Sequence, residues 1–266
     1  MSKAPPKQPV SAANTLRLEV APAHTGHRIV IYGPGGVGKT SQADLAPGPV
    51  VSFDLDDSLG VLQPANTKRV AGIEGWDDLR KALNGPGWND IRTIVIDSGT
   101  KAEELALAWV IGNIPHEKGA GKTIKRIEDY GYGKGYQHLY DTFLVLLNDL
   151  DQHARAGRHV IIVCHDCTAS VPNPSGEDWI RYEPRLQSPS SGKASIRLRV
   201  REWADHVFFL GLDVVVKDGK AAGRGTRTLW PVEMPHCMAK SRTLADAMPI
   251  ELGKTTLWDA LLGKDK

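Results

Sequence analysis

Gly33-Pro34-Gly35-Gly36-Val37-Gly38-Lys39-Thr40 is the stretch that decides the fold. It matches the pattern G-x-x-x-x-G-K-[ST] at every fixed position. The apolar residues 28–32 before it are typical of a buried strand, and residues 41–46 after it predict a short helix that Pro47 ends. Glycines between a strand and a helix let backbone N–H groups point inward at phosphate oxygens. The stretch therefore predicts a P-loop that binds a nucleoside triphosphate.

The residue types of this loop each have an expected role. Lys39 reaches the β- and γ-phosphates, the Thr40 hydroxyl is a ligand of Mg²⁺, and the helix N-terminus adds its positive dipole end. We expect ATP and Mg²⁺ as the bound cofactors. The expected nucleotide contacts are Gly33, Pro34, Gly35, Gly36, Val37, Gly38, Lys39, Thr40 and Ser41.

A second Gly-Lys-Thr, residues 121–123, fails the same test. The position five residues before Gly121 is His116 rather than glycine, and no apolar strand leads into it. We interpret this segment as a basic loop.

Composition sets limits on the class of protein. The chain has 266 residues and a formal net charge of +2, so polyanion binding must come from local patches. Its three cysteines do not form a disulfide framework, and no apolar run reaches the length of a membrane span. The first residues lack the apolar region of a signal peptide. We expect a cytoplasmic protein with no membrane partner.

Strands and helices alternate along most of the chain. Beyond the P-loop, buried strands are predicted at residues 49–53, 93–97 and 159–164, and helices at 76–83, 101–111 and 136–155. Residues 112–135 are predicted to be a long loop. Such alternation predicts an α/β fold, a mostly parallel sheet flanked by helices, with the ligand at the carboxyl ends of the strands.

The pattern changes after residue 166. A stretch rich in Pro, Ser and Gly, residues 166–195, precedes short strands predicted near 196–201, 206–211, 213–217 and 226–231, with a hairpin turn at 217–220. We expect a disordered arm over 1–22, a core over 23–245 that includes a small β-rich C-terminal extension, and a tail with a short helix over 246–266.

Acidic residues follow two of the strands. Asp97 ends an apolar run, where a carboxylate holds Mg²⁺ directly or through water; the alternative is that Asp97 or Ser98 caps the next helix. Asp54, Asp56 and Asp57 follow another strand, and one of them is expected to orient the water that attacks the γ-phosphate. The alternative is a solvated loop with capping aspartates.

One further polar residue ends a strand on this edge. His165 follows the last buried strand, where it would face the nucleotide, or would merely cap the strand end.

These motifs together resemble the core of RecA-type ATPases. The resemblance covers about residues 27–245 and adds 239–242, Ala-Lys-Ser-Arg, which is similar to a short basic motif of that superfamily. More narrowly, the chain resembles phage-encoded RecA-core proteins that act in single-strand annealing. The resemblance implies that Asp56 is the catalytic carboxylate and His165 the γ-phosphate sensor. It also implies that Lys240 and Arg242 reach a neighbour's nucleotide across a subunit interface.

The resemblance also implies partners. These are single-stranded DNA, further copies of the chain in a ring or filament, and a single-strand DNA-binding protein. Two basic segments are candidate DNA contacts, unless they are an ordinary solvated strand face and loop. They contain Arg181, Arg185, Arg197, Arg199 and Arg201, with 197, 199 and 201 on one face of the predicted strand, and Lys122, Lys125 and Arg126 in the 112–135 loop.

The sequence thus predicts a RecA-like ATPase that acts on single-stranded DNA in phage-type recombination or annealing. Two alternatives stay open. One is a motor or loader ATPase that acts on protein or duplex DNA. The other is a DNA-binding module that binds ATP without hydrolysing it.

Overall fold

A computed structural model describes residues 26–117, 119, 123–189, 194–217 and 220–263. The predicted N-terminal arm and Lys122 lie outside these ranges.

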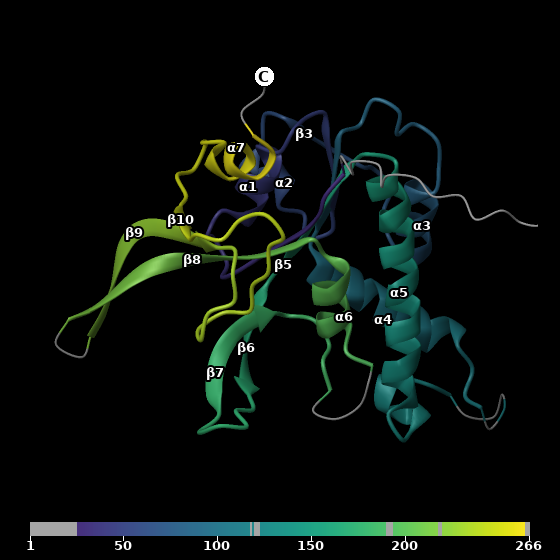
Figure 1. Ribbon diagram of the computed structural model, residues 1–266. Coiled ribbons are helices and arrows are strands. Elements are labelled where there is room, and N and C mark those ends of the chain that lie inside the picture. The colour runs from purple at the N-terminus through teal and green to yellow at the C-terminus, as the bar shows by residue number, and fades with distance from the viewer. Residues whose placement is uncertain (1–25, 118, 120–122, 190–193, 218–219, 264–266) are drawn as a thin grey trace, which may run out of the picture.

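An eight-stranded sheet forms the centre of the described chain (Figure 1). Its strand order is β10-β9-β8-β1-β5-β4-β2-β3. The strands from β8 to β3 are parallel, whereas β9 and β10 pair antiparallel at one edge. The strands are β1 (Arg28–Tyr32), β2 (Val50–Asp54), β3 (Thr67–Arg69), β4 (Thr93–Asp97), β5 (His159–Cys164), β8 (His206–Lys217), β9 (Lys220–Trp230) and β10 (Met248–Pro249).

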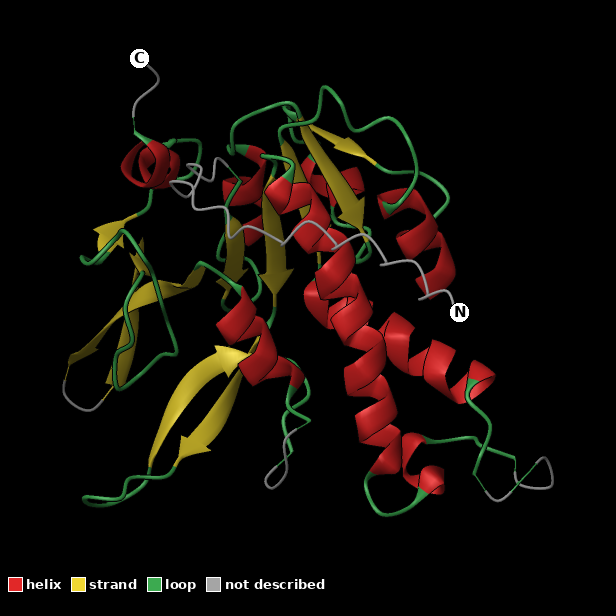
Figure 2. Ribbon diagram, turned by 45° about the vertical axis from the view of Figure 1, so that its right-hand side comes forward, coloured by secondary structure: helices red, strands yellow, loops and turns green. Residues whose placement is uncertain are grey.

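Helices cover both faces of this sheet, as Figures 1 and 2 show. They are α1 (Lys39–Asp44), α2 (Leu59–Leu62), α3 (Trp76–Leu83), α4 (Gly99–Asn113), α5 (Lys134–Arg155), α6 (Ile196–Trp203), α7 (Thr256–Leu262) and the 3-10 turn η1 (Ile127–Tyr130). Strand β1 shows why both faces are covered: Val30 and Tyr32 pack into the core beneath α3, α4 and α5. Ile29 and Ile31, pointing the other way, pack with residues of α1 and α7. The predicted fold class, a mostly parallel sheet flanked by helices with extra β structure near the C-terminus, is confirmed.

A two-stranded ribbon stands apart from the sheet. β6 (Asp166–Val171) and β7 (Trp179–Pro184) pair antiparallel and project away from the sheet, at the bottom of Figure 1. The Pro/Ser/Gly-rich composition of residues 166–195 concealed this ribbon in the sequence.

The strand predicted over 196–201 is wrong, because this segment is helix α6. The Ser195 side chain caps it by accepting a hydrogen bond from the Leu198 N–H. Ile196, Val200 and Trp203, spaced as one face of a helix, are its buried residues. Arg197, Arg199 and Arg201 therefore do not form a row on a strand.

The two strands predicted over 206–217 are one strand, β8, with a register irregularity between Leu212 and Val214. Lys217 pairs with Lys220 as the hairpin prediction requires, while residues 218 and 219 of its turn lie outside the described residues.

Candidate functional site

The P-loop connects β1 to α1 at the carboxyl edge of the parallel strands. Gly36 and Gly38 have φ values of 73° and 101°, a region that favours glycine. At Gly33, a side chain is excluded by space as well, because a Cβ would lie 2.0 Å from the Leu210 carbonyl oxygen. Gly33, Gly36 and Gly38 are thus required by the loop conformation.

Lys39 lies over this loop. Its Nζ donates hydrogen bonds to the carbonyl oxygens of Gly33 (2.7 Å) and Pro34 (2.8 Å). The residue is 8% exposed, and burial lowers the pKa of its ammonium, opposed mainly by the charge of Asp97. The loop thus positions a desolvated ammonium where a phosphate chain would lie.

Thr40 and Asp97 meet beside the loop. The Thr40 hydroxyl donates a 2.6 Å hydrogen bond to Asp97 Oδ2, across the gap from α1 to the end of β4. Burial raises the pKa of Asp97, and the Thr40 hydrogen bond opposes that shift. A hydroxyl and a carboxylate fit Mg²⁺, which takes one or two protein oxygens together with nucleotide phosphates. Ser98, not Asp97, caps α4, by accepting from the Lys101 N–H.

The three acids after β2 have different surroundings. Asp54 is buried and accepts hydrogen bonds from the backbone N–H groups of Ser58 and Leu59. Asp57 is 79% exposed and pairs with an arginine of β3. Asp56 alone of the three points back to the site, with Oδ2 3.2 Å from His165 Nε2. The structure thus brings together Asp56 and His165, whose catalytic roles stay predictions.

His165 also lies between β5 and β6, where the β6–β7 ribbon begins. Its backbone N–H donates to Thr100 Oγ1 (3.2 Å), and its carbonyl accepts from the Arg185 N–H (2.8 Å). The Thr100 hydroxyl in turn donates to the Arg185 carbonyl oxygen (3.1 Å). The sequence analysis missed Thr100. Its position in the first turn of α4, after the acid-ended strand β4, was the available signal.

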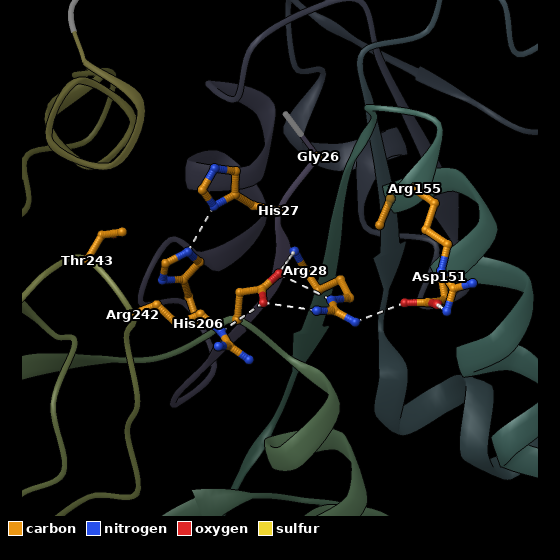
Figure 3. Close-up of a pocket in the computed structure, with 10 residues that line it drawn as sticks. Gly26, His27, Arg28, Asp151, Arg155, His206, Arg242 and Thr243 are labelled. Atoms are coloured by element: carbon orange, nitrogen blue, oxygen red, sulfur yellow. Dashed lines mark hydrogen bonds and ion pairs between the residues drawn. The ribbon is translucent and has the colours of Figure 1, made fainter. Parts of the chain in front are cut away.

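Lys240 and Arg242 lie at the amino ends of the parallel strands, where β1 and β8 begin, and the P-loop lies at the carboxyl ends. Lys240 Nζ donates to backbone carbonyls at the end of α6, including those of Arg201 (3.0 Å) and Ala204 (2.7 Å). Arg242 Nε lies 3.0 Å from Asp205 Oδ1, in the pocket of Figure 3. The structure therefore does not bring these two residues to the P-loop of the same chain.

The predicted DNA contacts divide into interior and exposed residues. Arg181 is 7% exposed and pairs with Glu183 (2.9 Å) and with Glu233. Arg197 pairs with the other oxygen of Glu183 (2.5 Å). The structure therefore does not present these two arginines as free surface charges, and their contact with DNA stays an untested prediction. Arg201, half-buried, also pairs with Glu233. Lys125, Arg126, Arg185 and Arg199 are exposed.

The fold and this site define a P-loop nucleotide-binding domain. A family model described as an AAA domain (AAA_24) matches residues 25–243, and the chain belongs to this family. No curated protein matches the chain. Among solved structures, the chain is similar to a KaiC-like protein of the hyperthermophilic archaeon Pyrococcus horikoshii OT3. The two are 14% identical, with a TM-score of 0.42, over 86% of this chain and 87% of that one.

No helix of the described residues has both the length and the apolar character needed to cross a membrane.

Proposed function

We propose that the protein binds Mg–ATP and hydrolyses it, with Asp56 orienting and activating the attacking water. The observation that carries this proposal is the 3.2 Å contact between Asp56 and His165. It lies on the sheet edge that also holds Lys39 and the Thr40–Asp97 pair. A nucleophile-activating group, a phosphate-binding ammonium and a magnesium-binding pair are the parts that phosphoryl transfer to water requires.

Each residue of the site has a separate role in the proposed hydrolysis. Loop amides and Lys39 would bind the triphosphate, and Thr40 and Asp97 would hold Mg²⁺. Bound Mg²⁺ would neutralise charge that develops on the phosphate oxygens. Asp56 would accept a hydrogen bond from the water and take its proton as the water oxygen bonds to the γ-phosphorus and the bond to the ADP oxygen breaks, which releases ADP and phosphate. His165, hydrogen-bonded to Asp56, fixes the direction of that carboxylate.

Phosphate release from Mg–ATP by the purified protein tests this proposal. We expect turnover that Lys39→Ala and Asp56→Ala abolish. Asp56→Ala should still bind Mg–ATP, because the hydrogen bond of Asp56 is to His165 and the loop and Lys39 remain in place. Tight binding without any turnover in the unaltered protein would instead favour the alternative of an ATP-dependent binding module.

We further propose single-stranded DNA as the effector of this turnover. The β6–β7 ribbon supports this, because it starts at His165 and returns to it through the Arg185 N–H (2.8 Å). A strand of nucleic acid that moves the ribbon would therefore act on the residue beside Asp56. Ile180 (70% exposed) and Tyr182 (41% exposed) offer apolar and aromatic surface on β7 for bases.

Turnover measured with and without single-stranded DNA tests the effector. Stimulation that weakens as salt rises would support DNA, because phosphate contacts release counterions. Stimulation by duplex DNA or by protein alone would favour a motor or loader ATPase.

Because Lys240 and Arg242 lie away from their own P-loop, any role at the γ-phosphate requires a second copy, so we propose assembly of several chains. Dependence of turnover on protein concentration tests that assembly.

A further inference from the structure

The P-loop has a different neighbour on each side of β1. In the sheet order, β5, β4 and β2 lie on one side of β1, and β8, β9 and β10 lie on the other. His165, Asp97 and Asp56 follow β5, β4 and β2, so the magnesium and γ-phosphate end of the site is on the first side. We therefore expect the α-phosphate, ribose and base to leave the loop on the second side.

An exposed leucine, Leu252, lies on that second side. Leu252 follows β10 and lies against the P-loop, since a Cβ built on Gly38 would be 2.6 Å from Leu252 Cδ2. Its side chain is nevertheless 49% exposed. What distinguishes Leu252 from the other exposed apolar residues named here is its contact with Gly38 of the P-loop, so its open surface is available to a ligand bound there.

The chain holds Leu252 in this place from both ends. Ile250, two residues before it, is 4% exposed, and its N–H donates to the Arg227 carbonyl oxygen (2.9 Å) on β9. Gly253, with φ of 79°, turns the chain, and the Lys254 N–H donates to the Glu251 carbonyl (3.3 Å). On the far side Trp258 of α7 is buried and donates from Nε1 to the Gln42 carbonyl of α1 (2.8 Å). The tip of this turn is thus fixed over the P-loop.

We propose that Leu252 is the base-contacting residue of the nucleotide site, taking one face of the purine ring as it leaves Gly38. This inference rests on the proposed function and adds the site of the base to it. The contact is apolar, so it reads no hydrogen-bonding edge of the base. Leu252 therefore adds affinity for ATP and GTP alike, and adds none for a phosphate chain without a base.

Titration calorimetry with two probes tests this inference. The probes are Mg–ATP and Mg–tripolyphosphate, which carries the phosphates without ribose and base. For Leu252→Ala we expect the Kd of Mg–ATP to rise about five- to tenfold, in line with losing part of a buried leucine contact. The Kd of Mg–tripolyphosphate should stay within about twofold, because this probe has no base for Leu252 to contact.

Leu198→Ala is the matched control, because Leu198 is a leucine of similar exposure (46%) on α6, which packs against α5 and lies away from α1 in Figure 1. It should change neither Kd. Leu252→Met, which keeps an apolar side chain of similar size, should bind Mg–ATP nearly as well as the unaltered protein.

Two results would overturn the inference alone. One is an equal loss of ATP and tripolyphosphate binding in Leu252→Ala, which would mean that Leu252 only shapes the loop. The other is an unchanged Kd for Mg–ATP. Failure of the unaltered protein to bind either probe would instead overturn the proposed function on which the inference rests.

Discussion

The Thr40 hydroxyl donates a 2.6 Å hydrogen bond to Asp97 Oδ2, joining the first turn of α1 to the end of β4. The two residues are 57 positions apart in the chain, and two different strands carry them to the same edge of the sheet. Both groups present oxygen atoms, one neutral and one acidic, as Mg²⁺ requires. Thr40 and Asp97 together are the expected Mg²⁺ ligands beside the P-loop.

Asp97→Asn should therefore impair the use of Mg²⁺. The amide can still accept the Thr40 hydrogen bond but carries no charge, so we expect kcat/KM for Mg–ATP to fall by about 10²-fold or more. Phosphate release measured over a range of Mg²⁺ concentrations checks this. An unchanged magnesium dependence would remove Asp97 from the metal site.

Asp56 and Asp57 form a natural comparison for the catalytic carboxylate. Asp56→Asn should lower kcat by roughly 10²- to 10⁴-fold, because the water loses its proton acceptor, while the Kd of Mg–ATP is kept. Asp57→Asn should leave kcat within about twofold, because Asp57 is exposed and pairs with Arg69 away from His165. Equal losses in both variants would argue against a specific role for Asp56.

Arg181 and Arg185 separate stability from nucleic-acid binding. Arg181→Ala leaves the buried carboxylate of Glu183 without this partner, so we expect a loss of about 3–5 kcal/mol in the free energy of unfolding. Arg185→Ala, at an exposed position, should change that free energy by less than about 0.5 kcal/mol.

Urea unfolding measures the first effect, and titration with single-stranded DNA measures the second. Of the two substitutions, we expect only Arg185→Ala to reduce the affinity for DNA and the dependence of that affinity on salt concentration. A stable Arg181→Ala protein with weakened DNA binding would reverse this assignment.

His206 should make stability depend on pH. It is buried, with Nε2 2.9 Å from His27 Nδ1 (Figure 3). Its Nδ1 lies 2.9 Å from the Ser241 hydroxyl. Burial, followed by the neighbouring His27, lowers the pKa of His206 to about 4. In the unfolded chain the imidazole has its ordinary pKa near 6.5. Its contribution to stability is therefore complete above about pH 6.5 and is lost as the pH falls toward 4.

Urea unfolding between pH 7.5 and pH 4.5 measures this dependence. The unaltered protein should lose roughly 2–3 kcal/mol through His206 as the pH falls. His206→Gln cannot take up a proton and should show a flatter profile. A profile as steep in the variant as in the unaltered protein would contradict the role of His206.

The parts of the fold that the sequence predicted well have local signals. The P-loop, β4 and α3 each combine a buried apolar pattern with a clear start or stop, and their positions follow from that pattern. Helix α6 shows the opposite case. Its alternating Arg and Leu or Val residues match the period of a strand, while Ile196, Val200 and Trp203 match that of a helix, and only packing decides between them.

The site shows the same limit. The positions of Lys39 and Thr40 followed from the P-loop motif and that of Asp97 from the apolar run it ends, whereas their roles stay predictions. The partners of Lys240 were not predictable, since the carbonyls that it binds belong to the end of a helix some 36 to 39 residues earlier in the chain. The partner of Arg181 was not predictable either, because Glu233 lies 52 residues later in the chain.

Titration calorimetry of Mg–ATP against the unaltered protein and Lys39→Ala tests the central claim most directly. We predict measurable binding to the unaltered protein and a loss of at least about tenfold in affinity when the ammonium is removed, because it is the buried cation of the loop. Equal affinity of the two proteins, or no heat from either, would contradict the account.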